Sequence, residues 1–77
     1  MRSSTDIVIH INEKLDNDHR ERFSSEVCQV SGVLSANLPD NRPHLMIVAY
    51  NPVETKSVDV LSGVRDKGVH AQLVGWL

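Results

Sequence analysis

The stretch 33–50, VLSANLPDNRPHLMIVAY, decides the fold of this 77-residue chain. Two apolar segments, 33–38 and 45–50, flank a turn cluster at 39–43 that contains two prolines, an aspartate and an asparagine. The second segment is continuously apolar, which is typical of a central strand. The stretch therefore predicts a β-hairpin whose second strand lies inside a sheet.

The residues before the hairpin predict a strand followed by a helix. Residues 7–11, IVIHI, are short and β-branched, so they predict a strand whose three isoleucines share the core face. Residues 16–18 are all good N-cap residues, and Phe23 and Val27 begin an apolar stripe at helical spacing. We expect this helix to end at Gly32, as a left-handed residue beyond its C-terminus.

The residues after the hairpin predict a second helix and a last strand. Asn-Pro at 51–52 breaks the third strand, and Thr55 or Ser57 can cap a helix that stops at Gly68. A glycine inside this helix, at position 63, costs about 1 kcal/mol relative to alanine. Residues 69–76 supply the last strand. The buried stripe of the helix consists of Val60, Leu61 and Val64.

The order of these elements defines the expected fold. It is an α+β, ferredoxin-like β-α-β-β-α-β arrangement, with a four-stranded antiparallel sheet and two helices on one face. The first and third strands should lie centrally. The chain is short enough for a single domain over 1–77, and we expect residues 1–5 to be disordered.

Composition excludes several classes of function. A net charge of -2 offers no field for nucleic acid or anionic membranes, and no apolar run is long enough to span a bilayer or form a signal peptide. A lone cysteine, Cys28, cannot form an intrachain disulfide, so a cytoplasmic location is expected. No nucleophile with a suitably placed base is recognisable, which indicates that the protein is not an enzyme.

Three landmarks resemble the heavy-metal-associated domain: Ser31-Gly32-Val33, the run from Val48 to Pro52, and Lys67-Gly68-Val69. The resemblance extends from Ile7 to Val74. In that family a Cys-x-x-Cys pair before the first helix binds Cu(I), and the family spacing places those positions at Asp16 and His19. The resemblance therefore implies the family fold without its soft-metal site.

The histidines leave a metal-binding alternative open. The topology brings His19, His44 and His70 to one end of the molecule, with His10 close by on the first strand, and His10 and His70 should project from the uncovered sheet face. Two or three of these imidazoles, with or without Asp16, could bind a divalent ion such as Zn, Ni or Co, which would then be the cofactor of the protein. The other interpretation is structural, because this spacing is not a recognised ligand signature: Asp16 is an N-cap and the histidines are surface residues.

The uncovered sheet face predicts an interaction surface. Strand alternation places an apolar set there, which in water usually marks a homodimer or a protein partner, unless a loop or terminus covers it. We therefore expect a small, non-enzymatic binding module that has lost soft-metal binding, with divalent-metal handling as the alternative. The residues expected on this face, besides His10, are Val8, Ile47, Ala49, Val74 and Trp76.

Overall fold

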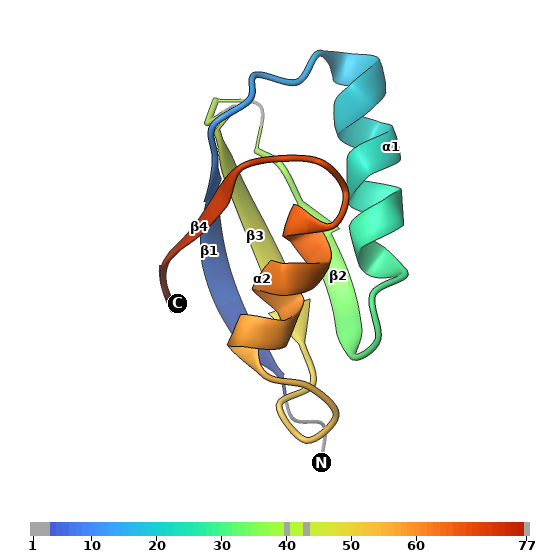
Figure 1. Cartoon of the computed structure of the whole chain (residues 1–77), viewed down its shortest axis with the longest axis vertical. Coiled ribbons are helices and arrows are strands. Elements are labelled where there is room, and N and C mark those ends of the chain that lie inside the picture. The colour runs from blue at the N-terminus through green and yellow to red at the C-terminus, as the bar shows by residue number, and fades with distance from the viewer. Residues whose placement is uncertain (1–3, 40, 43, 77) are drawn as a thin grey trace.

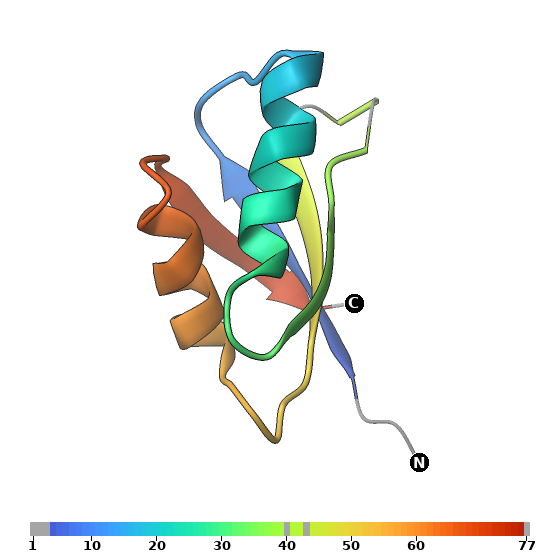
Figure 2. The same cartoon turned by 90° about the vertical axis from the view of Figure 1, so that its right-hand side faces the viewer.

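The computed structural model describes residues 4–39, 41–42 and 44–76. Its strands form one antiparallel sheet in the order β2-β3-β1-β4, and both helices cover the same face (Figure 1, Figure 2). The predicted ferredoxin-like β-α-β-β-α-β fold is therefore confirmed. The elements are β1 (Thr5–Ile11), α1 (Asn17–Cys28), β2 (Val33–Asn37), β3 (Leu45–Tyr50), α2 (Ser57–Arg65) and β4 (Ala71–Trp76).

The core lies between the helices and the central strands. Alternation along β1 buries all three of its isoleucines completely, as the sequence predicts. β3 pairs with β1 so that Val48 faces Ile7 and Met46 faces Ile9, and these side chains are also fully buried. Members of one cross-strand pair share a sheet face, so this register fixes which face the helices must cover. The helices contribute Phe23, Val27, Val60, Leu61 and Val64 to the core.

The helix ends differ from the sequence prediction in three places. Asp16 caps α1 as expected, but α1 ends at Cys28, and Gly32 takes its positive φ of 85° in the turn that follows. The N-cap of α2 is Lys56 and has no side-chain cap hydrogen bond, so the predicted Thr55 or Ser57 cap is wrong. α2 ends at Arg65, and Gly68 has its positive φ within the turn beyond the helix.

Gly63 lies within an unbroken α2 and allows a close helix contact. A Cβ at this position would lie 2.9 Å from Cγ1 of Val30, which follows α1. No side chain fits at that separation without a shift of one element. The helix-weakening glycine that the sequence shows is therefore required by packing between the two helical segments.

A bulge changes the phase of β4. Ile9 pairs with Leu73, but Val8 pairs with Gly75, so the register shifts by one residue between them. Beyond the bulge Trp76 lies opposite Ile7, whose side chain is buried under the helices. The expected position of Trp76 on the open sheet face is therefore wrong, because simple alternation does not anticipate an extra residue. The register thus gives Trp76 the phase of the helix side of the sheet, and its side chain is 60% exposed.

The chain ends fall partly outside the described residues. Disorder was expected for residues 1–5, but Thr5 is the first residue of β1, while residues 1–3 lie outside the described part. None of the described helices is long and apolar enough to cross a membrane.

Candidate functional site

Asp16 and His19, the two positions at which the sequence resemblance places the cysteines of the heavy-metal-associated domain, contact each other. Asp16 stands at the N-cap of α1 and His19 in its first turn, so both side chains lie at the exposed start of the helix. One carboxylate oxygen, Oδ1, accepts from the backbone N–H of His19 at 2.9 Å and from its ring Nδ1 at 2.7 Å. These bonds, the backbone bond first, hold the pKa of Asp16 below its ordinary value.

A second carboxylate and imidazole pair joins distant parts of the chain. Glu13, after β1, accepts from the backbone N–H of His70 at 2.9 Å and from its ring Nδ1 at 2.6 Å. The backbone N–H of Asn12 donates to the carbonyl of His70 at 2.9 Å. The bonds from His70, led by that of the ring, lower the pKa of Glu13. We call residues 12, 13 and 70 the loop clamp, because they tie the loop before α1 to the loop before β4.

The remaining two histidines stack on one another. The ring of His10, on β1, lies parallel to that of His44, with centroids 5.8 Å apart and an angle of 21° between the planes. Nδ1–H of His44 donates to the carbonyl of Ile11 at 2.9 Å, which fixes that ring at the end of β1. This pair borders the open face of the sheet, since His10 lies opposite Leu45 of β3.

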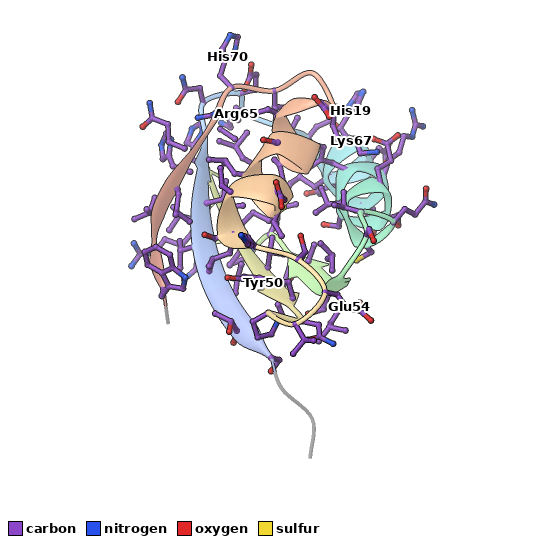
Figure 3. The ribbon with its side chains drawn as sticks, turned by 60° about the horizontal axis from the view of Figure 1, so that its bottom comes forward. His19, Tyr50, Glu54, Arg65, Lys67 and His70 are labelled. Atoms are coloured by element: carbon purple, nitrogen blue, oxygen red, sulfur yellow. The ribbon has the colours of Figure 1, made fainter. Side chains whose placement is uncertain are left out.

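The five predicted metal residues are thus divided among three separate pairs, one of which His70 forms with Glu13. His70 does not stand beside His10, because β4 begins at Ala71 and the residue opposite His10 is Gln72. Figure 3 shows His70 and His19 at the same end of the molecule, the former beside β4 and the latter on α1. Within residues 4–39, 41–42 and 44–76, no group of three or more His, Cys, Asp or Glu side chains could hold a metal ion.

Sequence reasoning missed one residue of these pairs. Glu13 meets His70 across 57 residues of sequence, and no local spacing signals such a contact. Cys28 is exposed at the last turn of α1, because the buried stripe of this helix consists of Phe23 and Val27 on another side.

The open face of the sheet carries a half-buried apolar strip over its two central strands. Val8 of β1 lies opposite Ile47 of β3, and both are half-buried by their neighbours on this face. Leu45 belongs to the same set because it alternates in phase with Ile47. Asp6 stands at one end of the strip and His10 at the other. We define the open-face strip as Val8, Leu45, Ile47 and Ala49, with the more exposed Val74 beside it on β4.

The two carboxylate and imidazole pairs should make the stability of the fold depend on pH in the acid range. Their pKa values are lowered on folding, so each carboxylate stabilises the fold above an ordinary pKa of about 4, and this contribution disappears as the pH falls through the folded value. We expect the urea concentration at the unfolding midpoint to decrease as the pH is lowered from about 6 to about 3. The decrease should be less steep in the double variant Glu13→Gln with Asp16→Asn. Glu54→Gln with Asp59→Asn is the matched control. Equal slopes in both double variants would contradict the prediction.

Several solved structures have the same fold as this chain. No protein-family description and no curated protein sequence matches the chain. The structure of a copper binding domain from HMA7, a P-type ATPase, superposes with a TM-score of 0.82 at 17% identity, over 94% of this chain and 96% of that one. The N-terminal domain of a potential copper-translocating P-type ATPase from Bacillus subtilis gives 0.80 at 20% identity, over 97% and 92%. Oxidized MerP from Ralstonia metallidurans CH34 gives 0.79 at 10% identity, over 94% and 99%. At these identities the similarity establishes the fold alone.

Proposed function

We propose that this chain, which has the fold of the heavy-metal-associated domains, is a non-enzymatic module that associates with a second copy of itself through the open-face strip. In this proposed role the module does not bind soft metals. The lone Cys28 fits a reducing, cytoplasmic compartment. The observation that carries the proposal is the apolar strip itself, uncovered by any described element.

Two features support the loss of soft-metal binding. Cu(I) prefers thiolate and thioether ligands, and Asp16 and His19 offer a carboxylate and an imidazole in their place. These two side chains also satisfy each other through the 2.7 Å bond, which a metal bridging them would have to break. In this chain Asp16 therefore serves as the N-cap of α1.

The polar residues at the two ends of the open-face strip, Asp6 and His10, favour a second copy of the chain as the binding partner. A two-fold axis that lies between the two facing sheets, over Val8 and perpendicular to β1, would reverse the second β1 and set its Asp6 over His10 of the first. Both ends of the strip would then carry one such pair, and the apolar side chains between them would meet across about 10 Å, the ordinary separation of packed sheets. A parallel arrangement would instead place Asp6 over Asp6, which costs energy.

The test is Ile47→Asp, measured by sedimentation velocity over a range of concentrations. We expect the dimer dissociation constant to rise at least about 30-fold, because the interface would bury an unpaired carboxylate. Val58→Asp is the control, since it introduces the same carboxylate at an apolar residue of α2 that is 60% exposed and lies away from the open-face strip. A wild-type chain that stays monomeric at millimolar concentration would overturn the proposal.

A charge exchange separates a second copy from an unrelated partner. His10→Glu should weaken the dimer, because the new carboxylate of one copy would face Asp6 of the other in the proposed arrangement. Adding Asp6→Lys to the same chain should restore association. A partner of different sequence gives no reason for that rescue, so a double variant as weak as the single one rejects the symmetric arrangement.

The hydrogen bonding of the histidines favours a second candidate function, the binding of a divalent ion. Nδ1 of His19, His44 and His70 is already bonded to a carboxylate or a carbonyl, so Nε2 is the nitrogen that each ring can offer to an ion. Metal-binding histidines are usually oriented in this way by their other nitrogen. In this candidate a Zn, Ni or Co ion draws Asp16, His19 and His70, with His10 or His44, together on binding, because the described residues do not already form a group of three ligands.

Calorimetric titration with zinc, nickel and cobalt chloride tests the second candidate. If it is correct, wild type binds an ion saturably at micromolar concentration and His19→Ala with His70→Ala loses that binding. Dimer formation by the double variant should be unchanged, because neither residue lies on the open-face strip. If the wild-type chain binds none of the three ions, metal handling is rejected and the first proposal is not affected.

A further inference from the structure

A groove of about 950 Å³ runs between α1 and the edge strand β2, away from the open-face strip. Figure 2 shows α1 lying alongside β2. One end of the groove is crossed by Arg20, whose Nη2 donates to the carbonyl of Leu38 at 2.7 Å. The residues that line it are Asn17, Arg20, Glu21, Ser24 and Ser25 on α1, and Ala36, Asn37 and Leu38 on the strand side.

The strand wall of the groove offers backbone hydrogen-bonding groups. β2 is the last strand of the sheet on this side, and β3 is its one neighbour among the described strands. In an antiparallel strand, alternate residues direct N–H and C=O to the same side, so half of these groups in β2 point away from β3. The bulge near Leu34 leaves the segment Ser35–Asn37 in regular register with Ala49, Val48 and Ile47. An extended segment can add to this regular part.

The helix wall determines which side chains such a segment should carry. Along successive turns α1 presents the amide of Asn17, then the guanidinium of Arg20 with the carboxylate of Glu21. The hydroxyls of Ser24 and Ser25 follow. The formal charges of Arg20 and Glu21 cancel, and the other groups are neutral donors or acceptors. The wall therefore favours neither sign of charge, and the guanidinium already donates to the carbonyl of Leu38, whereas hydroxyl and amide side chains could exchange hydrogen bonds with the neutral groups.

We infer that this groove binds an extended peptide segment of a partner protein, which adds to β2 as a fifth strand and directs uncharged polar side chains, such as Ser, Thr or Asn, toward α1. Strand addition supplies affinity through the backbone, and alternate side chains supply specificity through the helix wall. The inference is independent of self-association through the open-face strip, because it uses a different edge of the sheet.

The experiment pans random heptapeptides displayed on phage against the immobilised wild-type chain, then titrates the enriched peptides into the isotope-labelled chain. We expect enriched peptides with Ser, Thr or Asn at alternate positions, and saturable amide shifts at Ser24, Ser25 and the segment 35–38. Outward amides of β2 should exchange with solvent at least about tenfold more slowly in the complex, because they become hydrogen-bonded. No enrichment, or shifts confined to the open-face strip, would overturn the inference.

Two variants of α1 sharpen the test. Ser25→Tyr places a ring in the groove and should weaken peptide binding at least about tenfold, while costing little helix stability. Cys28→Tyr makes a similar exposed change on the same helix outside the groove and should leave affinity within about twofold. Groove shifts without slower exchange in β2 would mean side-chain contact alone and would reject strand addition. Ile47→Asp should leave peptide affinity unchanged even where it separates the dimer.

Discussion

Val48→Asp is expected to unfold the chain. Val48 is fully buried, opposite Ile7 of β1 and Ala36 of β2, with the helices over it. A carboxylate at this position would lie among the apolar side chains of the core, and its burial costs more than about 4 kcal/mol. The loss is comparable with the total stability of a chain of this length, roughly 4–12 kcal/mol, so the folded population should fall steeply. Circular dichroism and the dispersion of amide NMR signals measure the outcome.

The neighbouring variant provides the control. Ile47→Asp introduces the same carboxylate one residue earlier, on the half-buried open face, where the monomer leaves it in contact with water. It should stay folded, with a urea midpoint far closer to that of wild type. If Ile47→Asp unfolds the chain and Val48→Asp does not, the assignment of the two sheet faces is reversed, and the proposed interface fails with it.

Gly32→Ala is expected to cost about 2–4 kcal/mol of stability. Gly32 has a φ of 85°, a conformation that side chains disfavour by about 1–2 kcal/mol. A Cβ there would also lie 2.6 Å from Cγ2 and 2.9 Å from Cβ of Thr55, so the loop before α2 would have to move. Urea unfolding followed by circular dichroism measures the loss.

Two further variants separate conformational strain from the clash. Gly68→Ala, at a φ of 93° with no atom within 4 Å of the new Cβ, should show the strain alone and cost about 1–2 kcal/mol. Thr55→Gly combined with Gly32→Ala removes the clash, so the loss caused by the alanine should shrink toward that at Gly68. Equal losses at Gly32 and Gly68 in the wild-type background would show that the Thr55 contact has no energetic effect.

The sequence predicts the fold well because its signals are local and repeated. The isoleucines of β1 alternate, the apolar stripes of the helices recur at three and four residues, and the turn at 39–43 is marked by prolines. Each of these patterns reflects burial on one face of one element. Burial in the structure follows them at every isoleucine of β1 and at Val60, Leu61 and Val64 of α2.

The site could be predicted only in part, because its contacts join distant residues. Asp16 and His19 are three residues apart, so their capping geometry could be foreseen, whereas the bond between Glu13 and His70 depends on how two loops meet. The position of Trp76 depends on a one-residue bulge beside Gly75, and a single glycine in a strand signals such a bulge only weakly. Alternation is reliable only as long as the ladder is regular.

The strand order β2-β3-β1-β4 has a consequence for how the protein is made. β1 is synthesised first among the strands, yet it lies between β3 and β4, and β4 is synthesised last. While the chain emerges from a ribosome, β1 can pair with β3, but its other edge and the core beneath α2 stay open to water until β4 is released. Cooperative folding should therefore follow the release of β4, and during synthesis the exposed edge of β1 is the part of the molecule that most needs protection from other nascent chains.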